Sequence, residues 1–193
     1  MSKELVALVG SAKARIDTGF SQVGRGLKAD DAVAKALMVL AARAVAKANA
    51  LALLAEHSHA NEALPILRSL LESVVQMRWV SAKDSARRAA DVLAEREKAS
   101  WQEIWDDERV KVRAQELGFW DERLSRVLSS CREHLHANAA GLPWGHLYAE
   151  KDGGVSRDEV LRATAALMAH AVKALDETWP GKFPGAEEMW RRV

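Results

Sequence analysis

An all-α fold is predicted by three features of the sequence. Only four prolines and eleven glycines occur among 193 residues, and the long stretches between them are rich in Ala, Leu, Glu and Arg, which favour helix. Apolar residues recur every three or four positions, whereas alternating runs of β-branched residues, the sign of half-buried strands, are not found. These features predict a single antiparallel bundle of about six helices, with residues 1–193 as one domain and residues 180–193 as a short C-terminal tail.

The first two helices are delimited by glycine and aspartate. A helix is expected over about residues 2–22, because Gly24 and Gly26 then provide stop signals. A second helix should begin after Asp30 or Asp31, since aspartate is a good N-cap for the apolar run that follows. One face of this second helix carries apolar residues, several of them small enough to allow close helix approach: Leu37, Leu40, Ala44, Ala48, Leu51 and Ala55.

The middle of the chain is predicted to hold two further helices. Residues 57–61 break the apolar pattern and suggest a tight turn, and Pro65 suits the first turn of a new helix. The third helix should therefore cover about residues 61–82, antiparallel to the second. A long, charge-dense helix is then expected over residues 84–117, ended by Gly118.

The last third of the chain is predicted to contain a fifth helix, a long loop and a final helix. The fifth helix should cover residues 121–137 and bury Leu124, Leu128, Cys131 and Leu135. Residues 141–154 form the longest irregular stretch. Ser156 and Glu159 make a capping box for the last long helix, which should run to Trp179, and a short amphipathic tail closes the chain.

The composition argues against several classes of protein. The 28 basic and 27 acidic residues leave a net charge of +1, which does not suit a dedicated nucleic-acid-binding or membrane-surface protein. No signal pattern opens the chain, and no apolar run approaches the length of a bilayer span. The lone Cys131 cannot form an intrachain disulfide, so a reducing compartment is expected. We therefore expect a soluble cytoplasmic protein of bacterial type.

Arg68 and Glu72 are the most informative polar residues, because an apolar helix face carries them. The apolar residues around them set a helical period: Leu64, Leu67, Leu71, Val74 and Val75. Arg68 and Glu72 lie on or beside this stripe, four positions apart, where each is the other's nearest partner. A lone charge in a dry core costs several kcal/mol, so we expect the two side chains to pair.

The loop at residues 141–154 is a candidate pocket wall. It carries Trp144, His146 and Tyr148 within five positions. Aromatic and imidazole side chains on a constrained loop can line a pocket, and they can equally cap one end of a bundle.

A metal site is an alternative reading of the histidines. Glu56 with His59, and Glu133 with His136, each show the Glu-x-x-His spacing that makes half of a di-iron site in helical bundles. The ligand set of this alternative would be His59, Glu62, Glu72 and His136. Histidines near helix C-termini also complement the helix dipole without any ligand. No nucleophile elbow and no phosphate-cradling glycine loop occurs, and we expect no cofactor.

A family resemblance is carried by two segments. The run Glu-Ala-Leu-Pro-Ile-Leu-Arg-Ser-Leu-Leu-Glu at 62–72, followed later by His-Leu-His-Ala-Asn at 134–138, resembles the bacterial all-α domain-of-unknown-function family 5677. The likeness covers roughly residues 35–175. It implies that Arg68, Glu72 and His136 occupy the family's polar positions, and it carries no activity with it.

Two classes of function stay open for a cluster of Arg68, Glu72 and His136. The cluster can fix helix register in an interaction or regulatory protein, such as an accessory of stress response or phage defence, working as a homodimer through its small-residue and Trp-bearing faces. It can alternatively serve a hydrolytic or metal-dependent enzyme with His136 as acid–base or ligand group. The expected partners are a second copy and another protein or a small molecule, rather than nucleic acid or membrane.

The pairing of Arg68 with Glu72 predicts a graded loss of stability. Glu72→Ala should cost about 3–5 kcal/mol if burial is deep, because it leaves the guanidinium uncompensated. Glu72→Gln should cost less, since its amide oxygen still accepts a hydrogen bond. Thermal unfolding followed by circular dichroism measures both, and two variants that melt within about a degree of the parent would show that the pair is exposed.

Overall fold

The computed structural model describes residues 2–98, 107–118, 125, 129 and 156–193. This part of the chain holds seven α-helices and one short 3₁₀ helix, and it holds no β-strand, which confirms the all-α class. The elements are α1 (Ser2–Val23), η1 (Gly24–Gly26), α2 (Ala32–Glu56), α3 (Leu64–Ser81), α4 (Ser85–Lys98), α5 (Asp107–Glu116), α8 (Arg157–Thr178) and α9 (Ala186–Trp190).

Local chemistry places several helix ends where the sequence predicts them. Asp31 caps α2, because its carboxylate accepts a hydrogen bond of 3.0 Å from the backbone N–H of Ala34. Ser156 and Glu159 form the expected capping box of α8, with each side chain accepting from the other residue's backbone N–H. α3 begins at Leu64, three residues later than expected, so that Pro65 lies in the first turn and its missing N–H costs no helical hydrogen bond.

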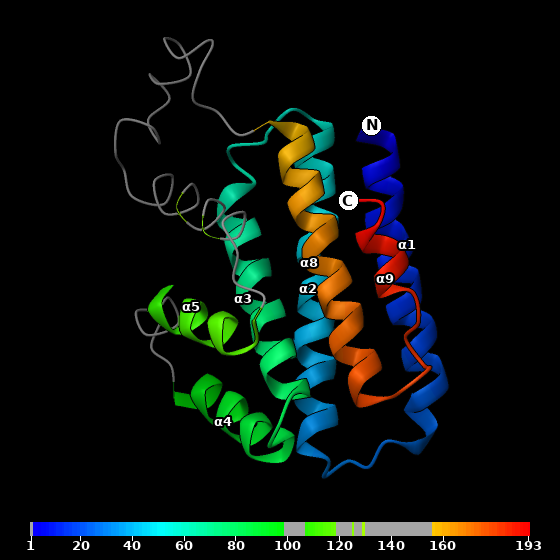
Figure 1. The fold of residues 1–193 in the computed structure, drawn as a ribbon, viewed down its shortest axis with the longest axis vertical. Coiled ribbons are helices and arrows are strands. Elements are labelled where there is room, and N and C mark those ends of the chain that lie inside the picture. The colour runs from blue at the N-terminus through cyan, green and yellow to red at the C-terminus, as the bar shows by residue number, and fades with distance from the viewer. Residues whose placement is uncertain (1, 99–106, 119–124, 126–128, 130–155) are drawn as a thin grey trace.

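The helices form a bundle in which α2 and α8 lie at the centre (Figure 1). α1, α2 and α3 alternate in direction along the long axis of the molecule. α8 contacts all three and runs in the same direction as α1 and α3. α4 and α5 pack against α3 on one side of the bundle, and α9 packs on α8 at the other side.

Helix α2 is the hub of the packing, because it contacts α1, α3, α4 and α8. Its inner face is the one expected from the sequence, and every member of the predicted set is at most 1% exposed: Leu37, Leu40, Ala44, Ala48, Leu51 and Ala55. The alanines let the neighbouring backbones approach closely, while the leucines fill the space between them.

The expected continuous helix over residues 84–117 is wrong. The described part of this segment consists of two helices, α4 and α5. Arg88 of α4 and Arg113 of α5 both lie over the ring of Trp79, with their Cζ atoms 4.8 and 4.0 Å from its centroid. On one straight helix these arginines would be about 37 Å apart, so α4 and α5 cannot be parts of one straight helix.

The expectation about apolar runs also needs correction. α2 is long and apolar enough to cross a membrane by length and composition, with a mean hydropathy of 1.7 over its best 18-residue window. An inspection for uninterrupted apolar runs misses it, because Lys35, Arg43 and Lys47 interrupt the run. In the bundle, the inner face of this helix is buried against its four neighbours.

Phe183 is the most deeply buried contact of residues 180–193 with the bundle. Phe183 is fully buried and meets Phe20 edge-on at a centroid distance of 5.1 Å, with Trp179 beside both rings. The backbone N–H groups of Gly181 and Phe183 both donate to one carboxylate oxygen of Asp176. This segment therefore completes the core between α1 and α8.

Gly19 makes the approach of Phe183 possible. A Cβ atom at Gly19 would lie 2.2 Å from the Phe183 ring, whereas a Cβ at Gly10 of the same helix meets nothing within 4 Å. Gly10→Ala should therefore stabilise the protein by about 0.5–1 kcal/mol through helix propensity. Gly19→Ala should instead destabilise it by about 1–3 kcal/mol, because the buried ring must move.

Chemical denaturation of the two alanine variants and the parent tests this difference in sign. A Gly19→Ala variant as stable as Gly10→Ala would show that Phe183 does not pack against α1 as described.

Candidate functional site on helix α3

Arg68 and Glu72 are half-buried on α3, beside the fully buried Leu67 and Leu71. They lie at the edge of the apolar stripe, as the helical period predicts. Water reaches both residues in part, so the loss of stability on Glu72→Ala should fall below the 3–5 kcal/mol expected for deep burial.

The other predicted site residues are only partly within the described part of the chain. His136, Trp144, His146 and Tyr148 lie outside the described residues, so their approach to Arg68 and Glu72 stays a prediction. Of the alternative metal ligands, His59 Nδ1 lies 3.9 Å from Glu62 Oε2, and both side chains are more than half exposed in the turn before α3. Within the residues described, no three His, Cys, Asp or Glu side chains are grouped to hold a metal ion.

Lys47 joins α2 to the middle of α3. Its ammonium group donates hydrogen bonds of 2.8 Å to the carbonyl oxygen of Ser69 and 2.7 Å to Ser73 Oγ. The Ser73 hydroxyl in turn donates to the Ser69 carbonyl oxygen at 3.0 Å. Ser73 is only 3% exposed, so this small network fixes how α2 and α3 are placed along each other.

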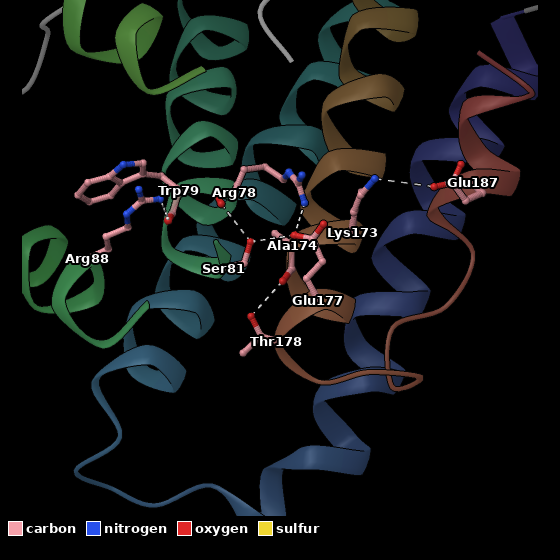
Figure 2. Close-up of polar contacts among 9 residues, drawn as sticks. All are labelled: Arg78, Trp79, Ser81, Arg88, Lys173, Ala174, Glu177, Thr178 and Glu187. Carbon is pink, nitrogen blue, oxygen red and sulfur yellow. Dashed lines mark hydrogen bonds and ion pairs between the residues drawn. The ribbon is translucent and has the colours of Figure 1, made fainter. Parts of the chain in front are cut away.

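Arg78 and Glu177 join the C-terminal ends of α3 and α8 (Figure 2). Arg78 Nη1 donates to the Glu177 carboxylate, and Ser81 Oγ lies 3.2 Å from the same oxygen atom. The Arg78 side chain is 12% exposed and that of Glu177 is 37% exposed. The arginine is thus shielded from water, whereas the carboxylate is open to it. The pair joins α3 to α8.

Trp79 is held between two arginines from different helices. Arg88 of α4 lies over the ring and also donates a 2.9 Å hydrogen bond to the Trp79 carbonyl oxygen, as Figure 2 shows. Arg113 of α5 lies closer to the ring centroid and is only 8% exposed. Cation–π contacts of this kind strengthen as the cation loses water, so Trp79 is the anchor that holds α4 and α5 on α3.

These polar contacts were not identified from the sequence, although the position of Lys47 could have indicated one of them. Lys47 stands three residues after Ala44 and four before Leu51, a spacing that puts it on the inner face of α2. Arg78 and Glu177, and likewise Trp79 and Arg113, are far apart in the chain, and no local pattern relates them. In the described structure, these groups hold helices to one another.

The anchoring role of Trp79 predicts an energetic coupling with Arg113. A double-mutant cycle of Trp79→Leu and Arg113→Met removes the π face and the charge while keeping apolar volume, and we expect a coupling free energy of about 1 kcal/mol from denaturant unfolding. Arg87→Met is the matched control, because the Arg87 side chain is 70% exposed and points elsewhere. Coupling of Arg87 and Arg113 to Trp79 by equal amounts would contradict the stacking.

Comparison with known proteins gives a match to a family. No curated protein and no solved structure matches the chain. A model of the family of unknown function DUF5677 matches residues 34–152, which is more than half of the chain and includes α2, α3, α4 and α5. The match begins just inside α2 and contains Arg68, Glu72 and His136, the positions on which the sequence resemblance was based. The chain belongs to the DUF5677 family.

Proposed function

We propose that the chain is an interaction or regulatory protein that binds another protein chain through the outer face of α2. The observation that carries the proposal is the position of the large exposed apolar side chains. Met38, Val39 and Leu53 are 43%, 37% and 58% exposed, and all three lie on α2. In the described part of the chain, the only other large exposed apolar residue is Val112 on α5.

The outer face of α2 departs from what a surface helix normally shows. A helix with one face in a core usually carries charged and polar residues on the opposite face. On α2, the exposed positions between Met38 and Leu53 are mostly apolar, with Ala42 and Ala46 between the larger residues. Exposed apolar surface of this kind marks interaction sites, because its burial is favourable and its exposure is costly.

The polar contacts between helices support the same proposal from inside the molecule. Lys47, Arg78, Arg88 and Arg113 are engaged in contacts that join helices to each other. They stabilise the bundle whose surface includes the outer face of α2. An accessory role in stress response or phage defence in the bacterial cytoplasm is a setting that this proposal suits.

One pair of substitutions tests the proposal. Leu53→Arg places a charge in the outer face of α2, and Val112→Arg makes the same kind of change at an exposed apolar residue on α5. Because both sites are exposed, both variants should keep the melting temperature of the parent within about two degrees. Cross-linking in living cells, followed by mass spectrometry, should then give protein adducts on α2 for the parent and Val112→Arg, and lose them for Leu53→Arg.

Two results would overturn the proposal. The first is a set of α2 adducts that is identical in all three proteins. The second is a parent chain without α2 adducts that purifies with stoichiometric metal, because this points to the metal-dependent alternative instead.

A further inference from the structure

The outer face of α2 has the spacing of a helix-pairing seam. Of its nine exposed residues, all but Met38 and Arg43, which lie beside the seam, follow one another at alternating intervals of four and three positions: Lys35, Val39, Ala42, Ala46, Asn49, Leu53 and Glu56. Alternation of this kind is a repeat of seven, which keeps a seam facing a second helix along its whole length. The inner face of α2 is already occupied by α1, α3, α4 and α8, so the seam lies on the side that these helices leave open.

Two larger apolar side chains flank a small residue in the middle of the seam. Ala46 stands in the middle with Ala42 nearby, and the larger Val39 and Leu53 stand seven positions on either side of Ala46. Small residues at the centre let two helix backbones come close, and the larger residues then fill the space on both sides. A partner helix with the same sequence fits this pattern, because it offers the same residues in reverse order.

The charges at the two ends select the direction of the pairing. Lys35 is exposed at the N-terminal end of the seam and Glu56 at its C-terminal end, about 31 Å away along the helix. Neither side chain forms an ion pair within the described part of the chain. In a parallel pair, like charges would face each other at both ends. In an antiparallel pair, each Lys35 comes within one residue of Glu56 on the other chain, and the helix dipoles also oppose favourably.

We propose that α2 pairs with α2 of a second copy of this chain, antiparallel, with Ala46 on the two-fold axis. This inference deepens the proposed function by naming the partner that the outer face accepts, and it rests on that function. With Ala46 on the axis, Val39 faces Leu53 of the second copy, and Arg43 faces Asn49. Each of these contacts occurs twice, because the interface is isologous.

Site-specific cross-linking of the full-length chain tests the pairing and its direction. Val39→Cys and Leu53→Cys chains, each on a Cys131→Ser background, are treated with a short bis-maleimide separately and as a mixture. Cross-linked dimers should form in the mixture and not in either chain alone, because two copies of residue 39 are about 21 Å apart along an antiparallel pair. Dimers in each separate sample would show a parallel pair and overturn the proposal.

Charge exchange provides a second measurement that does not depend on cysteine variants. In sedimentation equilibrium, Lys35→Glu and Glu56→Lys should each weaken the dimer about tenfold, because each change creates repulsion at both ends. The double variant should return the dissociation constant to within about threefold of the parent. Failure of the double variant to recover would contradict the antiparallel arrangement.

Failure of the self-pairing can be told apart from failure of the proposed function. A parent chain that stays monomeric at high concentration overturns the self-pairing. If cross-links that depend on Leu53 to another protein are still found in cells, the proposed function stands with a different partner. If the monomer instead binds phospholipid vesicles through a Leu53-dependent contact, both proposals are overturned in favour of a membrane surface.

Discussion

The close approach of other helices to the inner face of α2 is the constraint on which the rest of the bundle depends. Four helices contact α2, and the alanines at positions 44 and 48 keep that face flat enough for them to do so. An alanine contributes little apolar area of its own, so its effect is geometric: it lets the larger leucines on both sides reach their neighbours. A larger side chain at either position would push a neighbouring helix outward and weaken the packing along the inner face of α2.

Polar contacts between helices then fix the register of the helices, which apolar packing alone leaves undetermined. Apolar surfaces attract without direction, and helices packed only by leucine and alanine could slide by a turn at modest cost. The hydrogen bonds from Lys47 to Ser69 and Ser73, and the pairing of Arg78 with Glu177, connect particular turns of α2, α3 and α8. Trp79 does the same for α4 and α5 through Arg88 and Arg113. Register in this bundle therefore depends on a few polar contacts between helices.

The features that could be predicted from the sequence are those with local causes. Asp31, Pro65 and the Ser156–Glu159 box determine helix ends through contacts within a few residues, and these were found. The division of residues 84–117 into α4 and α5 was missed because this segment contains no glycine or proline. The long-range contacts of Trp79 could not be predicted without knowing that division. The edge position of Arg68 and Glu72 followed from periodicity, whereas their degree of burial depended on neighbours from other parts of the chain.

The attachment of residues 180–193 to α1 has a consequence for how the protein is made. The hydrogen bond from Arg15 to the carbonyl oxygen of Pro184 joins positions 169 apart, and Gly19 receives Phe183 across a similar distance. During synthesis, Gly19 stays without this contact until residue 183 has left the ribosome. Helices α1 to α5 are made first and can assemble around α2 in the meantime, so the packing of Phe183 is a late event that completes the core.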